Sequence, residues 1–279
     1  MLTADSSCDL GDELKARYHV QYYPGHVSLD GVEYADGVDL TPDDIFRIYK
    51  EKKVLPTTTA INVAEYLDFF RSFTEQGYEV IHLNLGSGIT ATHQNARLAA
   101  AELTGVWAVD SHSLSTGFGM LVMEAGERIA RGMDSAQVVT EVEALRDRVQ
   151  ASFVLDSLEF LYKGGRCSAL SALGANLLQL KPCIEVDNRD GSMHVGKKYR
   201  GTLDKSLETY AADKLKGRND IRLDKVFITH TGISEERIAA VKGWIAQYQA
   251  FENIYVTRAG ATITTHSGPN TLGILFITK

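Results

Sequence analysis

Short apolar runs bounded by turn residues recur along this 279-residue chain. Most of them are separated by segments in which apolar residues follow a helical period. Such runs predict β-strands, because strands are short and rich in β-branched and aromatic residues. We expect strands at residues 78–85, 106–110, 151–155, 181–186, 193–197, 225–230, 253–257 and 273–278.

Capping residues mark the starts of several expected helices. Thr41 precedes Pro42 and two acidic residues, a combination typical of a first helical turn. Ser234 opens a second helical pattern. Asp134 precedes a third pattern, in which apolar residues recur at helical spacing through Val149.

This alternation of strands and helices predicts an α/β fold with mostly parallel sheets flanked by helices. The chain length favours two lobes, and the pattern changes between residues 150 and 165, so we expect lobes at 1–155 and 156–279. A turn at 188–193 lies between two short strands and predicts a hairpin, which gives the second lobe some antiparallel strands. Parallel sheets bind ligands at the carboxyl ends of their strands.

Charge and composition exclude several classes of partner. The formal net charge of −7, with no basic run, argues against nucleic acid or an anionic membrane. No apolar stretch is long enough to span a bilayer, and the acidic N-terminus does not resemble a secretory signal. Cys8, Cys167 and Cys183 are odd in number and scattered, which predicts free thiols, no metal site and a reducing, cytoplasmic location.

Two segments concentrate hydroxyl groups at expected helix starts. Residues 86–88 form a Gly-Ser-Gly turn after a strand, and Thr90 and Thr92 follow it before a helix. Residues 57–59 are three consecutive threonines ahead of another helical pattern. Helix starts have unpaired N–H groups that bind anions, so the two segments could hold one carboxylate together. The alternative is that these hydroxyls only cap their helices.

Two basic residues are further candidates. Arg166 follows a pair of glycines that could present its guanidinium to an anion, although an ordinary surface arginine fits the same pattern. His266 lies in a loop that leads into a buried strand, where a lone histidine is more often structural. No G-x-S-x-G or H-E-x-x-H motif is present. The residues alone therefore predict an α/β protein with a polar anion site.

Eight segments taken together resemble one family. They are DSSCDL, DGVDLTPDD, LPTTTA, SGITATHQNA, VDSHSLSTGFG, YKGGR, LKPCIEV and HSGPNTLGI, and they occur in the order expected of the DegV family. Proteins of that family bind fatty acids and serve as the B subunit of bacterial fatty acid kinase. The resemblance spans nearly the whole chain and implies a two-lobed fold with a long apolar tunnel, closed at one end by a carboxylate site.

The resemblance also implies roles for particular residues. The segment PTTTA resembles the family's P-x-T-S-Q loop, so Thr58 would bind the carboxylate and Thr59 stands at the usual serine. The segment GSGITATHQ resembles the family's S-S-x-x-S-G-T-Y-Q loop. This match implies a second carboxylate-binding hydroxyl at Thr90 and a further N–H donor at Ala91.

Arg166 and His266 match basic residues that the family places near the carboxylate and its phosphorylated form. The implied function is to bind a long-chain fatty acid and present its carboxylate to the catalytic subunit of a fatty acid kinase, which forms the acyl phosphate. No catalytic residue and no cofactor are expected in this chain. Two alternatives stay open: a lipid sensor for another partner, and an enzyme that uses the same loops for phosphoryl transfer or hydrolysis.

Overall fold

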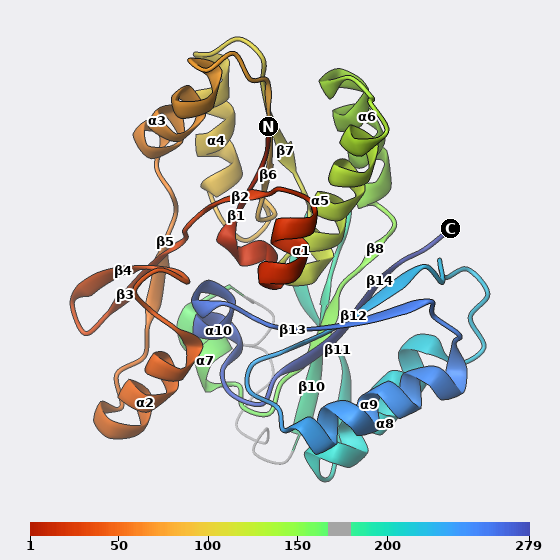
Figure 1. The fold of residues 1–279 in the computed structure, drawn as a ribbon. Helices are drawn as coiled ribbons and strands as arrows, with labels where there is room; N and C mark the ends of the chain where they lie inside the picture. The colour runs from red at the N-terminus through yellow and green to blue at the C-terminus, as the bar shows by residue number, and fades with distance from the viewer. Residues whose placement is uncertain (167–179) are drawn as a thin grey trace.

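The protein is an α/β fold built on two large sheets and a small third one (Figure 1). The computed structural model describes residues 1–166 and 180–279, and Cys167 lies outside these ranges. Within them, no helix is both long enough and apolar enough to cross a membrane. Cys8 and Cys183 are buried free thiols, as the sequence predicts.

The first sheet has four parallel strands in the order β2-β1-β6-β7. They are Gln21–Tyr23 (β2), Leu2–Asp5 (β1), Val80–Asn84 (β6) and Val106–Asp110 (β7). β1 and β6 are buried along their whole length. Helices α3 (Val63–Thr74) and α4 (Thr92–Ala101) cover one face of the sheet, and α5 (Ser115–Ala130) and α6 (Ser135–Arg146) cover the other (Figure 1). The carboxyl ends of all four strands meet at one edge of the sheet.

The second sheet has seven strands in the order β11-β10-β9-β14-β12-β13, with β8 paired to β14. They are Met193–Arg200 (β11), Leu180–Val186 (β10), Ser152–Val154 (β9), Leu272–Ile277 (β14), Lys225–His230 (β12), Asn253–Arg258 (β13) and Val149–Gln150 (β8). β10 and β11 form the hairpin predicted from the turn at 188–193. Within the described sheet only β12 and β13 pair in parallel, so antiparallel pairing extends beyond the predicted hairpin.

The positions of β8 and β9 bear on two predictions, namely where the helix after Asp134 ends and where the two lobes divide. The helix after Asp134 ends at Arg146, so the helical pattern predicted through Val149 is wrong at its end. Val149 instead pairs with Ile277 in the second sheet, where its β-branched side chain is buried. The lobe boundary at residue 155 stays a prediction, and the sheet order favours a boundary before Val149.

The third sheet has the strand order β4-β3-β5 and contains the threonine triplet. Its strands are Val32–Ala35 (β4), His26–Leu29 (β3) and Thr57–Thr59 (β5). The prediction that residues 57–59 start a helix is wrong, because Thr58 pairs with Val27 in extended backbone. The next helix is capped instead by Asn62, whose side chain accepts a hydrogen bond from Glu65 N.

Ten α-helices and one 3₁₀ turn complete the described part of the chain. They are Ser6–Cys8 (η1), Gly11–Arg17 (α1), Pro42–Lys52 (α2), Val63–Thr74 (α3), Thr92–Ala101 (α4), Ser115–Ala130 (α5), Ser135–Arg146 (α6), Glu159–Gly164 (α7), Leu203–Leu215 (α8), Glu235–Tyr248 (α9) and Ala261–Ser267 (α10). α5 is buried from Ser115 to Gly126 and lies between the two large sheets. Its apolar residues pack with Leu83 of the first sheet and Phe227 of the second, so one core joins both halves.

Candidate functional site

A pocket of about 290 Å³ lies where strand ends of both large sheets approach the third sheet. Asp5 of β1, Leu85 after β6 and Thr229 of β12 line it from the large sheets. Thr58 of β5 and His266 of α10 line it from the other side. The pocket is therefore at the carboxyl ends of strands, where ligands of α/β folds bind.

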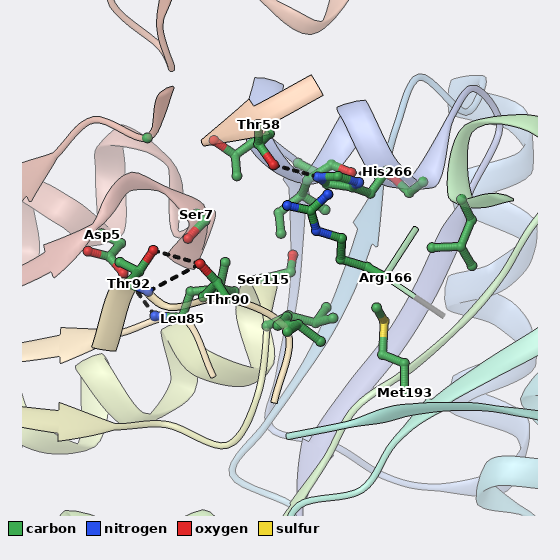
Figure 2. A pocket seen from close by; sticks show the side chains of 18 of the residues that line it. Asp5, Ser7, Thr58, Leu85, Thr90, Thr92, Ser115, Arg166, Met193 and His266 are labelled. Carbon is green, nitrogen blue, oxygen red and sulfur yellow. Dashed lines mark hydrogen bonds between the residues drawn. The ribbon is translucent and has the colours of Figure 1, made fainter. Parts of the chain in front are cut away.

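Thr58, His266 and Arg166 lie together at one side of the pocket (Figure 2). Thr58 Oγ1 and His266 Nε2 are 2.7 Å apart and share a hydrogen bond. The Arg166 guanidinium donates to the backbone oxygen of Gly164 at 2.6 Å, and the His266 ring packs directly on Gly164, which has no room for a side chain. Thr59 also lines the pocket, with an exposed side chain. The fold thus brings together residues that lie far apart in the sequence.

His266 is neutral near neutral pH. Burial, and after it the positive charge of Arg166, lower the pKa of the imidazole to about 4. Its Nδ1 is buried and has no hydrogen-bond partner among the residues that the structure describes. Arg166 is exposed, and its guanidinium is the cation of this group. Among these three residues an anion would therefore meet one cation, one hydroxyl and one neutral imidazole.

Thr90 and Ala91 lie at the start of α4, on another side of the same pocket (Figure 2). Thr90 Oγ1 accepts a hydrogen bond from Thr92 N at 3.2 Å and lies 2.8 Å from Thr92 Oγ1. Ala91 is the N-cap residue and offers no side-chain cap. Thr90 therefore helps to cap the helix, and its hydroxyl also faces the pocket.

Two glycines fix the loop that carries Thr90. Gly88 packs against the backbone of Asp190 and Gly191 in the β10–β11 hairpin, and a Cβ atom at residue 88 would overlap that backbone. Gly86 N donates to Ser113 O at 2.9 Å, and a Cβ atom at residue 86 would lie only 2.8 Å from Ser113 N. Close packing of main chain on main chain therefore positions this side of the pocket.

Asp5 organises the strand ends beneath the pocket through partners that the sequence could not identify. Its Oδ2 accepts a hydrogen bond from Leu85 N at 2.9 Å, and its Oδ1 accepts from Tyr66 OH and from His82 Nε2. Burial, and after it the charge of Asp5, raise the pKa of Tyr66 well above its usual value. The sequence shows Asp5 only at a strand end, because Tyr66, His82 and Leu85 follow it by more than 60 positions.

The rest of the pocket is largely apolar. Its aliphatic and aromatic side chains come from both halves of the chain and belong to loops, strands and the helices α7 and α10. They are Ile61, Leu85, Ile89, Leu114, Phe153, Leu161, Met193, Ile263 and Leu275. The sequence could not identify these inward-facing residues, because they are supplied by separate segments. One pocket thus combines a hydroxyl-rich region with an apolar wall.

The sequence profile of the DegV family, described as a family of uncharacterised proteins, matches residues 1–279. This chain belongs to the DegV family. The assignment agrees with the resemblance drawn from the eight motifs. A DegV domain-containing protein of Deinococcus radiodurans is 30% identical to this DegV protein over 274 residues, which cover 98% of this chain and 96% of the relative.

Solved structures of fatty-acid-binding proteins have the same fold. A fatty-acid-binding DegV family protein from Thermus thermophilus superposes with a TM-score of 0.88 at 30% identity, covering 100% of this chain and 99% of that one. A stearic-acid-binding protein from Eubacterium ventriosum superposes with a TM-score of 0.83 at 26% identity, covering 100% of this chain and 98% of that one. The fold class predicted from the sequence is thereby confirmed.

Proposed function

We propose that this DegV protein binds a long-chain fatty acid, with the acyl chain against the apolar wall and the carboxylate at Thr58 and Thr90. The observation that carries the proposal is the division of one pocket into an apolar wall and a hydroxyl-rich region. Thr59 and the Ala91 N–H would add donors beside the two hydroxyls. The fatty acids bound by the Thermus and Eubacterium relatives support the same ligand class.

The apolar wall would supply most of the affinity. Each buried methylene is worth about 0.8 kcal/mol, so about 14 methylenes would give on the order of 11 kcal/mol before the losses from ordering the ligand. The polar groups then need only to orient the carboxylate. Neutral hydroxyls suit this task, because they bind a carboxylate without a buried cation that would also attract phosphates.

We further propose that the protein is a non-catalytic, cytoplasmic carrier that presents the carboxylate to the catalytic subunit of a fatty acid kinase. Arg166, Thr59 and Ala91 are exposed residues that line the pocket, so the head group would lie within reach of a partner. Arg166 and His266 would stabilise the added charge of the acyl phosphate. No nucleophile of this chain takes part in such a transfer.

Mass spectrometry of the purified protein tests the proposal. We expect the native species to carry a stoichiometric fatty acid that is lost on denaturation, and the released molecule identifies the acyl chain. Empty protein should take up an added fatty acid with the same stoichiometry. A protein that is purified empty and takes up no added fatty acid would contradict the proposed function.

A further inference from the structure

The elements that carry one polar side of the pocket pack together as a unit. The third sheet and α2 share a small apolar core with Phe160 of α7 and Ala261 of α10. We call the third sheet, α2, α7 and α10 the α10 unit. Thr58 of β5 and His266 of α10 belong to it, and Arg166 directly follows α7. The end of β1 and the loop before α4 line the other side, so the pocket lies between the α10 unit and the first sheet.

Two buried carboxyl groups meet where the α10 unit joins the rest of the protein. Asp9 follows η1 and is 5% exposed, and Asp36 follows β4 and is 4% exposed. Gly260 N donates to Asp9 Oδ1 at 2.8 Å, and Ala261 N donates to Asp36 Oδ1 at 2.6 Å. A Cβ atom on Gly260 would lie 2.9 Å from Asp36 Oδ1 and 3.3 Å from Asp9 Oδ1. Both carboxyl groups therefore lie against the same glycine at the start of α10.

Hydroxyl groups fix the other oxygen of each carboxyl group. Ser115 Oγ, at the start of α5, donates to Asp9 Oδ2 at 2.5 Å, and Ser6 Oγ of η1 donates to Asp36 Oδ2 at 3.0 Å. Asp9 and Ser115 both have left-handed backbone, with φ of 53° and 50°. Residues other than glycine keep this conformation only where the surrounding structure imposes it. The joint between η1, α5 and the α10 unit is therefore tightly constrained.

Asp9 carries a proton at neutral pH. Burial raises the pKa of its carboxyl group to about 8, although the hydrogen bonds from Ser115 and Gly260 favour the charged form. The charge of Asp36 adds to the increase. α5 and α10 thus face Asp9 with uncharged donors, and the β4 side faces it with a carboxylate.

The other titratable groups around Asp9 carry no positive charge. Cys8 of η1 and Tyr22 of β2 both feel the charge of Asp9. Burial raises the pKa of Cys8 to about 12 and the pKa of Tyr22 above its usual value, so both are neutral. Asp5 of β1 is bound to the first sheet through Leu85 N. The charge that acts on Asp9 from the α10 unit is therefore the carboxylate of Asp36.

We propose that Asp9 and Asp36 form a proton-dependent clamp that controls how readily the α10 unit moves away from the first sheet and opens the pocket. A protonated Asp9 can lie beside an ionised Asp36, whereas two buried carboxylates repel each other. The closed joint binds the proton of Asp9 more tightly than a hydrated joint would. Loss of that proton to solvent therefore favours opening. The inference rests on the proposed function for the ligand, a fatty acid that would leave faster at alkaline pH.

The release rate of cis-parinarate, a fluorescent fatty acid, into excess phospholipid vesicles tests the proposal on full-length protein. We expect the wild-type rate to rise roughly tenfold between pH 7 and pH 9, because the ionised fraction of a carboxyl group with a pKa of about 8 rises by that factor. A wild-type rate that did not change with pH would overturn the proposal.

Asp9→Asn imitates the protonated carboxyl group. Its amide oxygen can accept from Gly260 N, and its amide nitrogen can donate to Ser115 Oγ. Release from this variant should stay near the wild-type rate of pH 7 over the whole range. Asp12→Asn is the matched control, because Asp12 is exposed on α1, and it should keep the wild-type rise. An equal rise in Asp9→Asn and wild type would exclude Asp9 as the group that titrates.

Urea denaturation of the ligand-free proteins gives a second readout that needs no fatty acid. The folded pKa of Asp9 lies above its usual value of 3.8, so the stability that its proton contributes is lost as the pH rises toward 8. The urea midpoint of Asp9→Asn should therefore rise relative to wild type between pH 5 and pH 8, and that of Asp12→Asn should not. A constant difference for Asp9→Asn would overturn the clamp. The expected midpoint shift in a protein that binds no cis-parinarate would overturn the proposed function instead.

Discussion

At Thr58 a neutral hydroxyl meets a neutral imidazole, and this contact defines the polar end of the pocket. The low pKa of His266 lets its ring donate or accept a hydrogen bond without adding charge. Since Nδ1 has no partner within residues 1–166 and 180–279, the hydrogen bond between Nε2 and Thr58 is the polar contact in this part of the chain that orients the ring. Under the proposed function, Thr58 would therefore bind the ligand directly and also position His266.

Thr58→Val tests this double role. Under the proposed function, we expect fatty acid retention to persist and acyl-phosphate formation by the kinase to fall roughly ten- to a hundredfold. A hydrogen bond to a charged group is worth about 1.5–3 kcal/mol, which corresponds to that loss. The measurement is transfer of labelled phosphate from ATP to protein-bound fatty acid.

Thr57→Val is the matched control for Thr58→Val. Thr57 is exposed on the same strand and does not line the pocket, so transfer should continue at the wild-type rate. Wild-type transfer by the Thr58→Val protein would exclude Thr58 from the carboxylate site.

Among the elements, the β10–β11 hairpin and the loop that carries Thr90 pack tightly against each other. Gly88 meets the hairpin backbone at Asp190 and Gly191, and backbone atoms cannot rotate away as a side chain can. The hairpin also supplies Met193 to the pocket. This contact therefore links a segment of the first half of the chain to a segment of the second.

Gly88→Ala should displace the loop and destabilise the protein by about 1–3 kcal/mol, the usual cost of overpacking. Urea denaturation measures the change in the free energy of unfolding. Gly243→Ala is the control, because a side chain at that position in α9 meets open space. The control should gain stability by about 0.5–1 kcal/mol. If Gly88→Ala unfolded at the wild-type urea concentration, the loop could not be tightly packed on the hairpin.

The threonine triplet shows which elements the sequence could and could not predict. Helical periodicity after residue 60 correctly indicated α3, and the strand after Gly77 was found to within two residues. The local pattern predicts a helix start at the triplet, because it gives no sign of the partner strand His26–Leu29, which lies about 30 positions earlier. Pairing between distant strands leaves no local periodicity, so the extended conformation of Thr58 required the fold.

At the scale of the whole molecule, a buried charge network joins the two halves of the chain. Glu124 of α5 forms ion pairs with Lys225 of β12 at 2.8 Å, with Arg222 at 2.7 Å and with Arg128 at 2.8 Å. Burial alone would raise the pKa of Glu124, but these cations outweigh it and lower the pKa to about 2. Glu124 is therefore ionised and holds the second sheet against α5.

Glu124→Gln should destabilise the protein by about 3 kcal/mol at pH 7, because it leaves the cations without their central partner. The depressed pKa contributes stability above the unfolded value of 4.5 that is lost as the pH falls toward 2. The difference between wild type and variant in urea denaturation should therefore shrink over this range.

Arg131→Ala is the control for Glu124→Gln. It removes an exposed partner of Glu127 and should cost less than about 1 kcal/mol. A Glu124→Gln effect as small as that of the control would show that the network does not hold the halves together.

The order of strands in the sheets is the part of the whole fold that the sequence could not predict. Alternating strands and helices indicated the α/β class, and the hairpin turn at 188–193 indicated β10 and β11. β9, however, pairs with β14, where Phe153 meets Gly273. No local signal joins residues that far apart, so the sequence could not predict the pocket that Phe153 and Gly273 help to line.

The sequence of strand β5 affects how the pocket tolerates insertions and deletions in the loop that precedes the strand. Successive side chains of a strand point to opposite faces, so a slip of one residue exchanges the residue that faces inward. In β5 such a slip would replace Thr58 with Thr57 or Thr59 opposite Val27. A threonine would face His266 in every one of these registers. The triplet therefore keeps a hydroxyl at the pocket even when the length of the preceding loop changes.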